Sequence, residues 1–175
     1  MLTCGCWSPE PVIDESDNTK SHKEVARWKS WVSLFAQMPR EIAKPYFVMR
    51  AIEPIESPTA ASPIEAESEL WTACEWLIHT AYTALECLRY RDLHREGDAP
   101  MMGDLCRMAV PDPFSLERWD WWKRRLAELA APDDVNAETK QRIAKALGSM
   151  EAAETRHSEV YGKEEGKDGK EKVKG

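Results

Sequence analysis

Apolar residues recur at spacings of three and four along most of this chain, which is the period of an amphipathic helix. Alternation of apolar and polar positions, the mark of a half-buried strand, has no useful length anywhere. The pattern predicts an all-α protein: a single helical, bundle-like domain of four to five helices with disordered termini. A short turn is expected over Leu105 and Cys106, between two of the longer helices. The predicted helices cover about residues 21–38, 41–53, 63–95, 116–131 and 137–156.

Helix-start signals agree with this period. Two Ser-x-x-Glu capping boxes, at Ser21 and at Ser62, predict helix starts, and the second has a proline at the first helical position. Ser115 and Asn136 precede two further apolar stripes and are expected to be N-caps.

Composition along the chain predicts three regions. Residues 1–20 are polar and aperiodic and are interpreted as a flexible arm, and residues 21–156 form the helical domain. Within it, residues 53–63 hold three prolines and are expected to be a linker. Residues 157–175 are rich in Lys, Glu and Gly and are expected to be a disordered tail.

The longest predicted helix is apolar on two sides. Its main stripe includes Trp71, Leu77 and Leu85, while Trp76 and Cys87 lie on the opposite side of the helical wheel. A helix of this kind is typical of the centre of a bundle or of a contact between two copies of a chain.

Charge and cysteine content narrow the function classes. The 175 residues include 24 Lys and Arg against 31 Asp and Glu, a net charge of −7, which argues against nucleic-acid binding. No apolar run reaches the length of a membrane span, and the N-terminus lacks the features of a secretory signal. Five cysteines are an odd number for a disulfide framework, so free thiols and a cytoplasmic location are expected, with the nucleus as the alternative.

Motifs for common nucleotide-dependent and metal-dependent enzymes are absent from the sequence, including the dinucleotide-binding and P-loop glycine patterns and His-Glu-x-x-His. We therefore assign no catalytic residue, no cofactor and no metal, and the sequence leans away from an enzyme.

One polar cluster stands out on the long helix. Glu75, His79, Tyr82 and Glu86 project into one arc beside the apolar stripe. Glu75 and His79 are four residues apart, so the carboxylate can orient the imidazole, as in a general base. The alternative interpretation, which we favour, is an ordinary solvated or half-buried polar face.

A second candidate is a tryptophan–arginine face on the helix after Ser115. Trp121 lies about 120° from the core direction and is flanked at helical spacing by Arg118 and Arg125. Guanidinium stacking on an exposed indole and a hot spot for a protein partner are equally good interpretations. Five of the eight tryptophans are expected in the core: Trp28, Trp31 or its neighbour, Trp71, Trp119 and Trp122.

The segment FSLERWDWWKRRLAELA resembles the C-terminal signature of a fungal, mostly ascomycete, family of unknown function, S-x-E-R-W-x-[FW]-W-K-x-R-[FL]. The segments around Trp76 and Gly103 are similar to other parts of that family. The resemblance implies a helical fold and a fungal intracellular protein, and it implies no activity or cofactor. The signature positions are Ser115, Glu117, Arg118, Trp119, Trp121, Trp122, Lys123, Arg125 and Leu126.

Two functions are consistent with these observations. The first is a non-catalytic protein-interaction module that binds a protein partner, or itself, through the surface at Arg118, Trp121 and Arg125 or through Trp76 and Cys87. The alternative is a small accessory enzyme or ligand-binding bundle with its site near Glu75 and His79.

Overall fold

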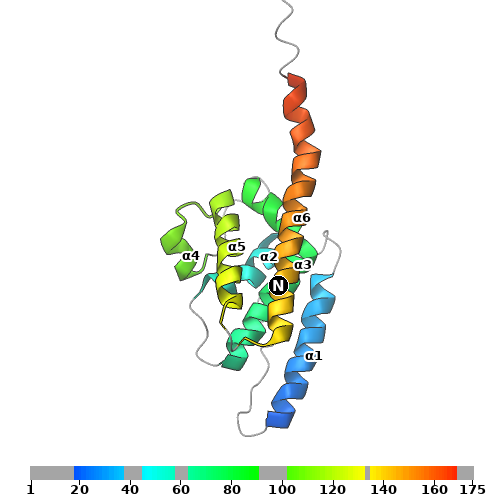
Figure 1. Ribbon diagram of the computed structural model, residues 1–175, viewed down its shortest axis with the longest axis vertical. Helices are drawn as coiled ribbons and strands as arrows, with labels where there is room; N and C mark the ends of the chain where they lie inside the picture. Colours follow the sequence, from blue (N-terminus) through cyan, green and yellow to red (C-terminus); the bar gives the residue numbers. More distant parts are fainter. Residues whose placement is uncertain (1–17, 38–44, 58–62, 91–101, 133–134, 169–175) are drawn as a thin grey trace, which may run out of the picture.

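The computed structural model describes residues 18–37, 45–57, 63–90, 102–132 and 135–168 (Figure 1). These ranges hold helices and no strand, so the all-helical prediction is confirmed. They contain six helices rather than four or five, because the expected turn at Leu105 and Cys106 is a short helix. The helices are α1 (Asn18–Ala36), α2 (Pro45–Glu56), α3 (Pro63–Arg89), α4 (Asp104–Ala109), α5 (Leu116–Ala130) and α6 (Ala137–Asp168).

Local sequence signals explain several helix starts. Pro45 and Pro63 occupy the first positions of α2 and α3, where a missing amide proton leaves no bond unmade. The Ser115 hydroxyl accepts a hydrogen bond from the backbone N–H of Arg118 at 3.3 Å, as an N-cap of α5. The Asn136 side chain likewise accepts a hydrogen bond from the backbone N–H of Thr139 at 2.8 Å, as the N-cap of α6. The prediction for Ser21 is wrong, since α1 already begins at Asn18.

Three boundaries differ from the prediction, and at two of them, in α2 and α6, tertiary packing outweighs local propensity. Helix α2 continues through Pro54 to Glu56, inside the predicted linker, and Ile55 and Glu56 are buried there. Helix α3 ends at Arg89 rather than near residue 95. Helix α6 continues past residue 156 to Asp168, and His157 in this extension is buried. The remaining parts of the predicted arm, linker and tail lie outside the described residues.

Helix α3 lies at the centre and packs against α1, α2, α5 and α6. Its second apolar side is covered, because Cys87 is fully buried and Trp76 packs between the main core and the Trp28–Val32–Trp71 cluster. The central-helix interpretation of α3 is therefore confirmed. The largest side chains of the main core are Ile52, Ile55, Leu77, Leu85, Leu88, Trp119, Trp122, Leu126, Ile143 and Met150.

Figure 1 shows how the remaining helices surround this centre. Helix α1 lies along one side of the body and α4 on the other, while α6 runs the length of the body and projects beyond it. Helix α3 is kinked at Thr80, whose φ of −126° and ψ of 15° are not helical. The Thr80 hydroxyl donates to the Trp76 carbonyl oxygen at 2.8 Å, a side-chain bond that often accompanies a helix bend.

Candidate functional site

The polar arc of α3 is divided between two neighbours rather than gathered around one site. Glu75, at the start of the arc, joins three helices. It accepts a hydrogen bond from Ser33 of α1 and forms an ion pair with Arg142 of α6, with 2.7 Å between Nη1 and Oε2. His79 Nε2 lies 3.4 Å from the same carboxylate. Arg142 also stacks over the Trp71 ring, 4.7 Å from its centroid.

These contacts define what Glu75 can do. The carboxylate is buried, and both of its oxygens already have partners within the protein, so it ties α1, α3 and α6 together. His79 is the most exposed member of the arc, with 31% of its side chain exposed. Neither residue meets a second carboxylate or imidazole in the contacts of this cluster, and no observation here favours the enzyme or ligand-binding alternative.

The other half of the arc faces the outer part of α6. Tyr82 and Glu86 are half-buried and interact with one another. Desolvation by burial raises the pKa of the Tyr82 phenol, and the charge and hydrogen bonding of Glu86 raise it further. The Tyr82 ring lies beside His157, with 6.5 Å between centroids, and the Arg156 guanidinium lies over the Tyr82 ring, 4.4 Å from its centroid. The predicted cluster is thus a helix face whose start contacts α1 and α6 and whose other half lies against α6 alone.

Arg118 is not part of an exposed tryptophan–arginine face. Its side chain has no exposed surface and forms a two-point ion pair with Glu56 of α2, from Nε to Oε1 at 2.6 Å and from Nη2 to Oε2 at 2.8 Å. The Glu56 carboxylate also accepts hydrogen bonds from the Trp122 indole and from the Gly103 backbone N–H at 2.9 Å. Arg118 donates further to the Pro113 carbonyl at 3.1 Å. This buried group links α2, the start of α4 and α5.

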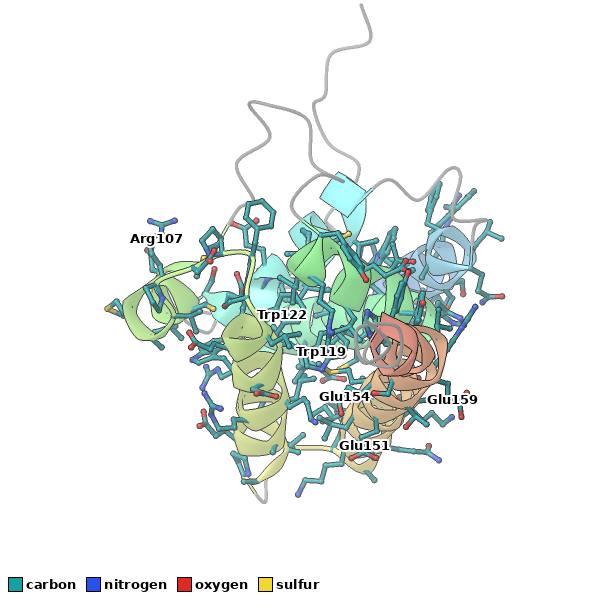
Figure 2. All side chains as sticks on the ribbon, turned by 90° about the horizontal axis from the view of Figure 1, so that it is seen from above. Arg107, Trp119, Trp122, Glu151, Glu154 and Glu159 are labelled. Atoms are coloured by element: carbon teal, nitrogen blue, oxygen red, sulfur yellow. The ribbon has the colours of Figure 1, made fainter. Side chains whose placement is uncertain are left out.

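The next signature residues bind a second carboxylate. Trp119 Nε1 donates to Glu154 of α6 at 2.6 Å, and Lys123 Nζ donates to the same oxygen at 2.9 Å. Figure 2 shows Trp119 and Glu154 pointing toward one another between α5 and α6. Burial alone would raise the pKa of Glu154, but the hydrogen bonds from Lys123 and Trp119 outweigh it and lower that pKa. The signature residues therefore hold α5 in place from both sides.

The remaining candidates are also largely covered. Trp121 is half-buried and packs against the small cluster of Met102, Cys106 and Val110 as well as the main core. Arg125 pairs with Glu128 on its own helix at 3.4 Å. Tryptophan burial was predictable for Trp119 and Trp122 but not for Trp121, whose partners come from a segment without apolar periodicity.

Cysteines and acidic residues do not form a metal centre in the part of the chain that the structure describes, where no group of three or more potential ligands occurs. Cys74, Cys87 and Cys106 are free and buried, and burial raises the pKa of each thiol to about 12. Thiols with such pKa values are protonated at neutral pH and are poor nucleophiles.

The exposed apolar face of α1 was not predicted from the sequence. Trp31, expected in the core, is 48% exposed, and Leu34 is 56% exposed. Together with Arg27 and Ser30 they line a shallow surface depression of about 260 Å³. Trp31 stacks on Phe35, with 6.1 Å between centroids. A signal was present, since Leu34 falls outside the helical stripe formed by Trp28 and Val32.

The fold and these clusters define an all-helical domain whose helices are joined by buried carboxylates. The chain belongs to the family described as protein of unknown function (DUF3632), whose model matches residues 7–126. Neither the curated proteins nor the solved structures compared with the chain gave a match. Within the described ranges, no helix is long and apolar enough to cross a membrane.

Proposed function

We propose that this chain is a non-catalytic protein-interaction module of the fungal cytoplasm, and that its docking surface is the outer face of α1. One observation carries the proposal: Trp31 and Leu34, on adjacent turns of a helix, are half exposed and line one depression with Arg27. Tryptophan and arginine are the residues most enriched where a few side chains dominate the affinity of a protein complex.

Helix geometry explains why these side chains do not serve the fold. Trp28 and Val32 bury their side chains toward α3, where Trp28 meets Trp71 with 6.4 Å between ring centroids. Leu34 lies two residues beyond Val32, which is about 200° around the helix, so it points away from the body. Exposed leucine and tryptophan keep apolar surface in water, and a partner that covers them recovers about 25 cal/mol for each Å² buried.

The charge of α1 indicates what kind of partner fits. The helix carries four basic residues and one acid, although the whole chain has a net charge of −7. Its exposed side chains include Lys23 and Arg27 and, among those that the structure describes, no acid. The partner that matches this face is an amphipathic helix with acidic residues beside its apolar stripe.

A second copy of the chain fits this face less well. Two copies meeting through α1 would bring Lys23 and Arg27 of each into one contact, and none of the exposed α1 side chains that the structure describes is an acid. We therefore propose an acidic amphipathic helix as the partner of this face, and self-association through α1 is a result that would contradict it.

The cellular setting rests on separate observations. Three free, buried thiols support a reducing compartment such as the cytoplasm. The resemblance of Ser115–Leu126 to the fungal signature supports the fungal origin.

The test compares Leu34→Asp with Ala26→Asp in the full chain. Both substitutions place one acid on an exposed position of α1, but only the first falls in the depression. Proteins captured by the unchanged chain from a fungal extract are purified, and their affinity is measured with the three purified forms. We expect Leu34→Asp to weaken binding at least tenfold, while Ala26→Asp stays within about threefold.

A captured partner whose binding segment is acidic, and whose affinity falls with Arg27→Glu and with added salt, supports the proposal. Equal binding by both variants contradicts it. It is also contradicted if light scattering shows a dimer that Leu34→Asp dissociates, or if crosslinks from position 34 lead to residues 1–17 of the same molecule.

A further inference from the structure

Aromatic rings around His157 attach the outer part of α6 to the end of α3. The His157 ring lies 6.5 Å from Tyr82 and 6.3 Å from Tyr90, both on α3, measured between centroids. On its own helix it lies 4.5 Å from Tyr161, which in turn lies 5.8 Å from Tyr90. His157 therefore occupies the middle of this group of rings.

The His157 side chain is buried in a way that suits only one of its protonation states. The residue is 3% exposed, and its Nε2 atom has no hydrogen-bond partner among the described residues. A neutral imidazole tolerates such a place, because its unprotonated nitrogen loses only a weak acceptor bond to water. An imidazolium would bury a charge and a second N–H donor without a partner, at much greater cost.

Charged groups from both helices face this ring. From α3 these are Glu86 and Arg89, and from α6 the neighbouring Arg156, which lies over Tyr82. Desolvation by burial lowers the pKa of His157, the charge of Arg89 lowers it further, and Glu86 opposes them. The tyrosines remain neutral at these pH values: the pKa of Tyr90, like that of Tyr82, is raised, by burial first and then by hydrogen bonding to Tyr161.

We propose that His157 is a pH-dependent switch. It holds the outer turns of α6 against α3 while its imidazole is neutral and releases them when the imidazole takes up a proton. Release would separate the ring of Tyr161 from that of Tyr90, which is already partly exposed, and would leave the Tyr161 ring more open to solvent. This device lies at the opposite end of α3 from the residues that contact α1, and it does not depend on the proposed docking surface.

The pH window follows from the two states of the imidazole. In the released state the pKa of His157 has its ordinary value near 6.5, and in the docked state it is lower. The released state therefore binds the proton first, and the docked state loses stability as the pH falls below about 6.5. For one such proton, the population of the released state rises at most about tenfold between pH 7.5 and pH 5.5.

The test follows hydrogen exchange of the full chain at pH 7.5 and pH 5.5, after correction for the intrinsic rate. We expect protection of residues 153–161 to fall severalfold at pH 5.5, within the tenfold limit, while residues 139–150 change less. His157→Phe keeps a ring but cannot titrate, so its pH-dependent loss should disappear. His79→Gln, which removes the exposed histidine of α3, should behave like the unchanged chain.

An independent measurement covers the case in which His157→Phe fails to fold. Nuclear magnetic resonance of the unchanged chain, which has four histidines, should give a titration midpoint for His157 below 6.5. A midpoint at 6.5 or above overturns the proposal. So does unchanged protection at pH 5.5, or an acid-induced loss that persists in His157→Phe. Glu154 does not confuse the result, since its lowered pKa places its titration below this window.

Discussion

Two buried glutamates, each paired with an arginine from another helix, play different parts in this molecule. Glu56 and Arg118 have no exposed surface, and every contact of the carboxylate comes from a donor in the core. Glu75 is buried as well, but its partner Arg142 keeps 25% of its side chain in solvent, and His79 opens the same group to water. One group is sealed and the other lies at the edge of the core.

This difference in exposure determines how much stability is lost when one member of each pair is removed. When one member of a fully buried pair is removed, the other remains charged with no water to solvate it. At the edge of the core, the remaining group can turn toward solvent and recover part of the loss. The sealed group should therefore dominate stability, and the open group should contribute less.

The largest effect is expected for Arg118→Met. The substitution leaves the Glu56 carboxylate buried without its two-point partner, and we expect a loss of about 3–5 kcal/mol in the free energy of unfolding. Chemical denaturation followed by circular dichroism measures it. The double variant Glu56→Met with Arg118→Met should recover part of the loss, and a loss below 1 kcal/mol for Arg118→Met would refute the sealed-pair interpretation.

A smaller effect is expected for Gly103→Ala, which tests the same group from its backbone side. A Cβ atom at Gly103 would lie 2.5 Å from the backbone carbon and oxygen of Glu56, so the two segments must separate. We expect a loss of about 1–3 kcal/mol, because overpacking of this kind displaces the bonded N–H. The matched control is Gly148→Ala on α6, where a Cβ atom meets nothing within 4 Å. That control should be neutral or stabilising.

The smallest of the three effects is expected for Glu75→Gln. The amide keeps one oxygen as an acceptor for Ser33, but it loses both the charge attraction to Arg142 and the second oxygen to which Arg142 donates. Because Arg142 can reach water, part of this loss is recovered. We expect a loss of about 1 kcal/mol in the same denaturation assay. A loss equal to that of Arg118→Met would remove the distinction between the sealed and the open group.

Periodicity and caps predicted the helices well, because both act within a few residues of the chain. Ser115 and Asn136 start the helices that they were expected to start. Partners distant along the chain were not predictable in this way. Arg118 was placed on the surface by its angle from the apolar stripe, and Glu56, 62 positions away, fell in the expected linker.

The same limit explains the other differences. A helical wheel assigns Trp31 to the core stripe, yet α1 packs against α3 through a narrower strip that leaves this ring half exposed. His157 stands at the start of the segment whose composition predicted a tail, and its burial depends on tyrosines contributed by α3. Composition describes a segment in isolation and does not include the surface that another helix offers.

The position of α6 has a practical consequence for choosing the boundaries of a fragment of this protein. The family match stops at Leu126, but Ile143, Ala146 and Met150 of α6 belong to the same continuous core as α3. A fragment trimmed to the matched region would leave that side of α3 uncovered and would also remove Arg142 from Glu75. The family match and the hydrophobic core thus have different boundaries in this protein.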